Sequence, residues 1–112
     1  MPDCLFCSIV EGEIPAQIVL RTDEFVAFTD ISPQAPVHIL VIPTEHHDDA
    51  ASMARANPEL AGRLLATTAQ VASEAGIEDY RLVFNTGTSA GQSVFHVHGH
   101  VLGGRDMTWP PG

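Results

Sequence analysis

The sequence predicts an α+β domain, built from an antiparallel sheet of about five strands, one long helix and a short N-terminal helix. Three observations carry this prediction. Short β-branched and apolar runs alternate with turn residues up to Pro43, one apolar pattern of helical period follows Asn57-Pro58, and two more extended runs follow Gly76. The 112 residues suit one core. We therefore expect residues 1–112 to form a single domain, in which 103–112 are a C-terminal tail.

The first elements are a helix and three strands. Asp3 is placed to cap a short helix over 5–10, which Gly12 and Pro15 end. Three extended runs follow at 17–21, 25–29 and 37–42. The turn residues 22–24 separate the first two, so these two runs predict a hairpin, and the third run joins the same sheet.

The second half contains the long helix. A short polar segment leads to Asn57, an N-cap residue, and to Pro58 at the first helical position. Leu60, Leu64 and Val71 then repeat at helical spacing, and Gly76 stands where a left-handed C-terminal cap belongs. The pattern after Gly76 predicts a strand over 80–85, a loop over 86–92 and a final strand over 93–102.

The charge balance excludes several classes of partner. The chain carries 14 acidic and 5 basic residues, the latter all arginine, and its formal charge is −9. Nucleic acids and anionic membranes are poor partners for such a surface, because binding to them depends on basic side chains. A phosphate ester would have to be held by histidines and backbone N–H groups. No apolar run has the length of a spanning helix, and the start lacks the features of a signal peptide, so we expect a cytoplasmic protein.

Three of the six histidines, His96, His98 and His100, alternate with small or apolar residues in the last predicted strand. Alternation would place all three rings on one face, with neighbours about 6.6 Å apart and the outer pair about 13 Å apart. Two adjacent rings could share a zinc ion, but three from one straight strand could not. Three polar rings together are unfavourable in a hydrophobic core, since each buried nitrogen needs a hydrogen-bond partner. We therefore assign this row a function.

The row resembles the signature of the histidine triad family, His-x-His-x-His followed by two apolar residues. The resemblance extends over segments 4–15, 28–36, 37–43 and 91–94 and over the terminal Trp-Pro-Pro-Gly, which are similar to the nucleotide-binding branch of purine nucleoside phosphoramidases, in its bacterial zinc-binding type. One departure is Gly99, where that family usually has a bulky apolar residue, and this predicts looser packing behind the triad.

The resemblance implies a catalytic role for four residues. His98, the middle histidine, would be the nucleophile that attacks the α-phosphorus, and His38 a partner close to the triad. A neutral imidazole suits this chemistry because its pKa near 6.5 leaves it largely unprotonated at pH 7. His100 could donate to a phosphate oxygen, and Ser93 with the backbone N–H groups of 91–94 supplies further donors.

The substrate-binding residues are also implied by resemblance. Asp30 would accept hydrogen bonds from the ribose hydroxyls, and Asn85 would contact the phosphate or ribose, with loop capping as the alternative for Asn85. Gln92 and Val94 belong to the phosphate-side turn. The apolar walls of a purine pocket would be Leu5, Phe6, Ile9, Phe28 and Ile31. For Leu5 and Ile9 an ordinary core role is an equal alternative.

Cys4 and Cys7 form a Cys-x-x-Cys pair, which in a reducing compartment suggests metal or redox chemistry more than a disulfide. The resemblance adds His46 and His96, giving a Cys2His2 set consistent with a closed, tetrahedral zinc site. His47 is the alternate ligand, and a pair of reduced thiols is the alternative to metal binding. The zinc would be structural, with no cofactor required for the chemical step.

The leading hypothesis is a hydrolase of P–N bonds that acts on purine nucleoside phosphoramidates or aminoacyl-adenylates through a nucleotidyl-histidine. The alternatives are a dinucleoside polyphosphate hydrolase, a slow nucleotide-binding regulatory module, and a zinc-storage or metalloregulatory protein. The resemblance also implies a homodimer, two protomers with the tail of one near the site of the other. The proline-rich end, Trp109-Pro-Pro-Gly112, fits neither helix nor central strand, so it is either frayed or docked.

Overall fold

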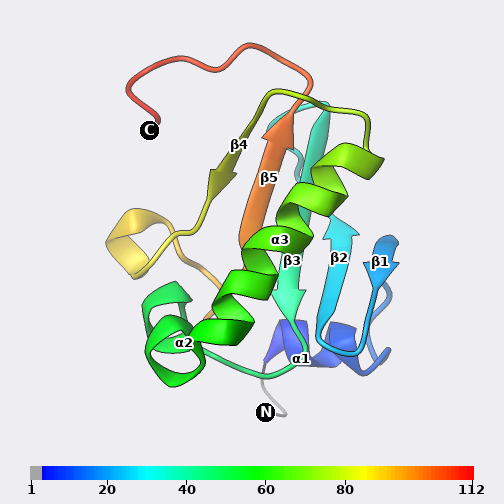
Figure 1. Cartoon of the computed structure of the whole chain (residues 1–112), viewed down its shortest axis with the longest axis vertical. Helices are drawn as coiled ribbons and strands as arrows, with labels where there is room; N and C mark the ends of the chain where they lie inside the picture. The colour runs from blue at the N-terminus through cyan, green and yellow to red at the C-terminus, as the bar shows by residue number, and fades with distance from the viewer. Residues whose placement is uncertain (1–3) are drawn as a thin grey trace.

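The computed structural model describes residues 4–112 and contains one five-stranded sheet with helices on both faces (Figure 1). The strand order is β1-β2-β3-β5-β4, and every pair of neighbours is antiparallel. The α+β fold predicted from the sequence is therefore confirmed. The elements are α1 (Leu5–Val10), β1 (Ile18–Arg21), β2 (Phe25–Thr29), β3 (Val37–Pro43), α2 (Ala50–Ala56), α3 (Pro58–Glu74), β4 (Tyr80–Val83), the 3-10 turn η1 (Thr88–Ala90) and β5 (Gly99–Gly103).

The two faces of the sheet carry separate apolar clusters because side chains alternate along each strand. Phe25, Ala27, Ile39, Val41 and Val101 face α3, whose Leu60, Leu64 and Val71 complete that core. Full burial of a side chain such as Leu64 contributes about 2 kcal/mol. Asn57 caps α3 by accepting from the Leu60 N–H, and Gly76 follows its end with φ +78°. Over residues 4–112, no helix is both long enough and apolar enough to cross a bilayer.

The opposite face of the sheet is covered by α1. Phe6 and Ile9 of this helix pack on Val26, Phe28 and Leu40, which alternate with the residues that face α3. The predicted cap, Asp3, lies outside the described residues. Cys4 occupies the N-cap position, where its sulfur accepts the Cys7 N–H at 3.4 Å. The first turn of α1 therefore carries both cysteines, and Phe6, which lies between them in sequence, points toward the sheet.

The segment predicted as polar and irregular between Pro43 and Asn57 contains a helix, α2. Asp49 caps it by accepting the Ser52 N–H at 2.8 Å. Met53 is the only large apolar side chain in its seven residues, and it is buried. One large apolar side chain gives no helical period, so the hydrophobic pattern of the sequence did not predict this helix. The Asp49 cap and the burial of Met53 stabilise it.

The final strand is shorter than predicted. β5 spans Gly99–Gly103, so His96 and His98 lie on the irregular segment that leads into it, and only His100 is in the strand. The Val97 N–H of this segment donates to the His47 carbonyl at 2.7 Å, which takes it away from the ladder of the sheet. The expectation of three histidines on one straight strand was wrong, and the change of direction allows their rings to serve different sites.

Candidate functional site

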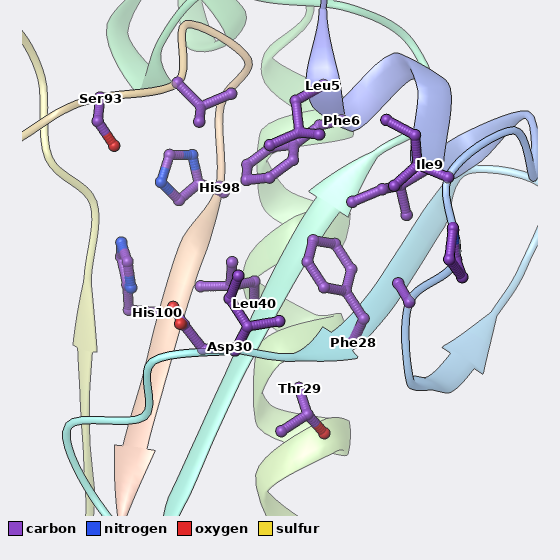
Figure 2. A pocket seen from close by; sticks show the side chains of 15 residues that line it. Leu5, Phe6, Ile9, Phe28, Thr29, Asp30, Leu40, Ser93, His98 and His100 are labelled. Carbon is purple, nitrogen blue, oxygen red and sulfur yellow. The ribbon is translucent and has the colours of Figure 1, made fainter.

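A cavity of about 340 Å³ opens between α1 and the sheet (Figure 2). One wall is apolar and the other end holds histidine and aspartate side chains, an arrangement typical of small-molecule sites. Most residues predicted to bind substrate or to act in catalysis are brought together here. The lining consists of Leu5, Phe6, Ile9, Ile14, Pro15, Ala16, Phe28, Thr29, Asp30, Ile31, Leu40, Ser93, Val94, His98 and His100.

His98 is held at the cavity in one tautomer. Its Nδ1–H donates to the His96 carbonyl at 2.8 Å, so the Nε2 atom keeps its lone pair. The ring meets Phe6 edge to face, with centroids 5.0 Å apart. Burial lowers the pKa of His98, and the hydrogen bond to His96 and the charge of Asp30 only partly oppose this shift. At neutral pH His98 is thus an uncharged imidazole with one available nitrogen, the form that a nucleophile needs.

His100 is oriented by a chain of hydrogen bonds that begins at the backbone. The Gln34 N–H donates to His38 Nδ1 at 3.0 Å, so His38 must carry its proton on Nε2. That Nε2–H donates to His100 Nδ1 at 2.9 Å, which leaves His100 with its proton on Nε2. Burial, followed by the neighbouring His98 and His38, lowers the pKa of His100 to about 4. His100 is therefore a neutral hydrogen-bond donor beside His98, with ring centroids 4.9 Å apart.

Asp30 lies where β2 ends, at the polar end of the cavity (Figure 2). The Ser32 N–H donates to its Oδ1 at 2.8 Å, and its Oδ2 lies 3.5 Å from His38 Nε2. The carboxylate is thereby fixed in orientation and retains acceptor capacity toward the cavity. Burial lowers the pKa of His38 although Asp30 opposes the shift, so His38 is neutral in this arrangement.

Two predicted substrate residues lie outside the lining. The amide of Gln92 is turned into the loop, where it accepts from the Gly87 N–H at 2.9 Å and donates to the Asp48 and Val94 carbonyls at 2.7 and 3.1 Å. Asn85 lies beside Gly91, which has φ +97°. The hydrogen bonds of Gln92 hold the loop that presents Ser93 and Val94, and the assignment of both Gln92 and Asn85 to the substrate stays a prediction.

Sequence reasoning missed Ile14, Pro15, Ala16, Thr29 and Leu40 among the lining residues. Leu40 could have been predicted, because it lies on the same face of β3 as His38. It is also the residue of β3 that pairs with His100 of β5. The three residues at 14–16 lie on the irregular segment between α1 and β1, where no period indicates which side chains point inward.

A second cluster of side chains lies at the N-terminus of α1. Cys4, Cys7, His46 and His96 bring one donor atom each within 4.8 Å of one another. His96 Nδ1 lies 3.3 Å from Cys4 Sγ, 3.5 Å from Cys7 Sγ and 3.1 Å from His46 Nδ1, and Cys7 Sγ lies 3.4 Å from His46 Nδ1. The edges of an ideal tetrahedron around zinc are about 3.6 Å between S and N and about 3.3 Å between two N, from the usual zinc–ligand bond lengths. The donor atoms therefore have the spacing of a Cys2His2 zinc site.

The protons of the two histidines in this cluster are directed away from its centre. His96 Nε2–H donates to the Pro43 carbonyl at 2.8 Å, and His46 Nε2–H donates to Asp48 Oδ1 at 3.1 Å. Two Nδ1 lone pairs consequently face each other at 3.1 Å, a repulsive contact that a cation between them would make favourable. His47 is turned to Glu45, with 2.6 Å between its Nε2 and Oε1, so His46 and not His47 completes the cluster.

Gly99 does not leave the loose packing that the resemblance predicted. A Cβ atom at this position would lie 2.8 Å from Cζ of Phe84 and 3.3 Å from Cδ1 of Leu82. The ring of Phe84 thus takes the volume that a larger side chain would need. Gly99 lies between His98 and His100, so this packing supports the backbone that carries both.

The tail is joined to its own chain by hydrogen bonds but leaves its tryptophan exposed. Trp109 is 83% exposed, although the Arg81 guanidinium donates to the neighbouring Thr108 carbonyl at 3.0 Å and so fixes the course of the tail. Arg105 is likewise fixed, donating to the Gln34 carbonyl at 3.0 Å. The arginine contacts thus fix the backbone of the tail, while its own protomer does not cover the Trp109 side chain.

Comparisons with known proteins show the family to which the chain belongs. The model of the HIT domain matches residues 11–107. A 14 kDa zinc-binding protein of Zea mays is 46% identical over 96% of this chain and 87% of its own length, and adenylylsulfatase HINT1 of Arabidopsis thaliana is 44% identical over 96% and 76%. The crystal structure of a HIT family hydrolase from Legionella pneumophila superimposes with a TM-score of 0.94 at 46% identity, covering 98% of this chain and 100% of that one. The chain therefore belongs to the histidine triad family, as its three closely spaced histidines and its fold indicated.

Proposed function

We propose that this protein hydrolyses purine nucleoside 5′-phosphoramidates, with His98 as the nucleophile. The observation that carries the proposal is the state of His98: a neutral imidazole whose Nδ1–H is bound to the His96 carbonyl, leaving Nε2 as a nucleophile at the end of an apolar cavity. Phe6 and Phe28 meet edge to face, with ring centroids 5.5 Å apart, and together form an apolar wall against which a planar base could pack, and Asp30 offers a carboxylate for the ribose hydroxyls.

The reaction would proceed in two displacements at phosphorus. His98 Nε2 attacks the α-phosphorus, the P–N bond of the substrate breaks, and the amine leaves after its nitrogen takes up a proton from water at the mouth of the cavity. His100 Nε2–H donates to a non-bridging oxygen and stabilises the charge that develops there. Water then cleaves the P–Nε2 bond and releases the nucleoside monophosphate, and His98 returns to its neutral form. No residue in these steps is a ligand of the cysteine–histidine cluster.

The leaving group is the open part of the proposal. The name of the adenylylsulfatase relative indicates that in that protein an adenylyl group is released from sulfate, and attack of His98 at the α-phosphorus would serve that leaving group as well. Adenylyl sulfate is therefore the second substrate to assay. A dinucleoside polyphosphate hydrolase and a slow nucleotide-binding module remain the alternatives, and the terminal Trp-Pro-Pro-Gly weighs against the first of these.

The test compares turnover of an adenosine phosphoramidate, adenylyl sulfate and a diadenosine polyphosphate by the wild type, His98→Ala and His47→Ala. We expect the phosphoramidate to be the best substrate, His98→Ala to lose turnover while its circular dichroism is retained, and His47→Ala, a histidine outside the cavity, to keep it. Rapid quenching and denaturing mass spectrometry should find a nucleotide adduct on His98. Turnover by His98→Ala, or an adduct on another residue, would refute the assignment, and nucleotide binding without turnover of any substrate would favour the binding module.

We further propose that Cys4, Cys7, His46 and His96 bind one structural zinc ion. When bound, the zinc would crosslink α1 to the segments that carry His46 and His96 as a closed four-ligand site. Its support is the spacing of the four donor atoms and the pair of facing Nδ1 lone pairs. The protein is also proposed to act as a homodimer, with the exposed Trp109 of each tail docking near the cavity of the other protomer.

A further inference from the structure

His96 belongs to both sites of the molecule. Its ring Nδ1 is in the metal cluster, 3.3 Å from Cys4 Sγ, while its backbone carbonyl accepts the Nδ1–H of His98 at 2.8 Å. The ring is completely buried, and its second nitrogen is bound to the Pro43 carbonyl. Because the ring is held on both nitrogens, its position is tied to that of the backbone whose carbonyl sets the tautomer and direction of His98.

Helix α1 is shared in the same way. Cys4 and Cys7 of its first turn are metal ligands, and Phe6 lies between them in sequence and forms part of the cavity wall. The Phe6 ring meets His96 at a centroid distance of 6.0 Å and His98 at 5.0 Å, edge to face in both cases. A second hollow of about 390 Å³ lies beside the metal cluster, and Leu5 is the residue of α1 that lines it. This hollow and the cavity have Leu5, Ser93 and Val94 in common.

We propose that zinc binding at the cysteine–histidine cluster and nucleotide binding in the cavity are thermodynamically coupled, with Phe6 and His96 as the positioning residues that carry the coupling. The inference rests on the proposed function for its ligand, a nucleoside monophosphate. Without metal, the two facing Nδ1 lone pairs repel each other and only weak thiol–imidazole contacts join the histidines to α1, so the start of this helix would be held less firmly against the sheet. The wall that Leu5 and Phe6 offer the base, and the carbonyl that orients His98, would then be less firmly fixed.

Coupling of this kind is reciprocal. If zinc raises the affinity for AMP by some factor, AMP must raise the affinity for zinc by the same factor. Because one helical turn and one histidine are shared, we expect a factor of roughly 10, within the 5- to 150-fold range usual for coupled sites. A zinc ion that only stabilised the fold at a distance would leave the AMP affinity of the folded protein unchanged.

The experiment measures both directions of the coupling on the full chain. AMP binding is titrated calorimetrically with zinc-loaded protein and with protein treated with a chelator, whose fold is checked by circular dichroism. Zinc affinity is measured by competition with a chromophoric chelator, with and without saturating AMP, and this second arm needs no stable zinc-free protein. Both arms should give a change of roughly tenfold in the same direction.

Phe6→Leu keeps all four metal ligands and removes the aromatic contact with His96 and His98. We expect this variant to bind zinc, but the factor by which zinc changes its affinity for AMP should fall from roughly 10 to about 2 or less. Phe25→Leu is the matched control, because Phe25 is an equally buried phenylalanine on the α3 face of the sheet, and it should keep the full coupling. An unchanged coupling factor in Phe6→Leu would overturn its role.

The outcomes separate this inference from the proposals on which it rests. Equal AMP affinity with and without zinc, together with equal zinc affinity with and without AMP, would overturn the coupling and leave the nucleotide site intact. Failure of the zinc-loaded protein to bind AMP would overturn the proposed function together with the coupling. Failure to bind zinc would overturn the metal site and the coupling, with AMP binding and turnover unaffected.

Discussion

Replacing Gly99 by valine tests how the packing behind the triad supports the two histidines beside it. A Cβ at this position lies 2.8 Å and 3.0 Å from the Cζ and Cε1 atoms of Phe84, well inside contact distance, and valine adds two more methyl groups. The Phe84 ring packs against the core that faces α3, so it can move only by disturbing its neighbours. Overpacking of this kind costs typically 1–3 kcal/mol, and we expect about 2 kcal/mol.

The partner substitution is Phe84→Val. The ring is half-buried, so its removal should cost about 1–2 kcal/mol, less than the values for fully buried phenylalanines. In the double variant the new valine at position 99 enters the space that the ring has left. The double variant should therefore be more stable than the sum of the single losses predicts, by about 1 kcal/mol or more.

Urea unfolding followed by circular dichroism measures all four proteins, at one fixed protein concentration because dimerisation would make stability depend on concentration. Turnover of the phosphoramidate is measured alongside. Gly99→Val should lose turnover because the displaced backbone carries His98 and His100, and the double variant should regain part of it. Additive losses of stability would refute the argument that Phe84 occupies the volume missing at Gly99.

Three further predictions follow from the geometry. Because burial holds the pKa of His100 at about 4 against 6.5 for the free side chain, the unfolded chain takes up a proton on His100 between these pH values that the folded protein does not. Stability should therefore fall as the pH is lowered from 6.5 toward 4, by about 3 kcal/mol from this residue. Urea unfolding at several pH values should show a shallower slope for His100→Gln, and an identical slope would contradict the assignment. Metal analysis should find about one zinc per chain, and Cys4→Ser should lower the unfolding temperature more than Ser8→Ala on the same helix, whereas less than about a tenth of an equivalent of zinc would refute the site. Deleting residues 107–112 should alter the relative rates for different leaving amines more than it alters stability, and unchanged selectivity would exclude the tail from the site.

Much of the fold was decided by local patterns. Local sequence decides the apolar runs of β2 and β3, the Asn57-Pro58 start of α3 and the positive-φ Gly76 after its end, and the sequence-based predictions at these positions are confirmed. α2 was not predicted because Met53 is its only large apolar side chain. The final strand was predicted too long because apolar residues and histidines already alternate over 95–98, where no described strand pairs with the chain.

For the candidate site, too, the sequence predicted some features and only the tertiary structure decided the others. Residue types and spacing alone singled out the histidine row and the Cys-x-x-Cys pair as chemical groups, because their periodicity and charge are visible in one dimension. Their division of labour was not visible. Only the tertiary structure sends the His96 ring to the cysteines while its carbonyl fixes His98, and only the Gln34 backbone N–H sets the tautomers of His38 and His100. The physical reason is that a hydrogen bond or a ligand position is determined by atoms far apart in sequence, and these meet only after the sheet has formed.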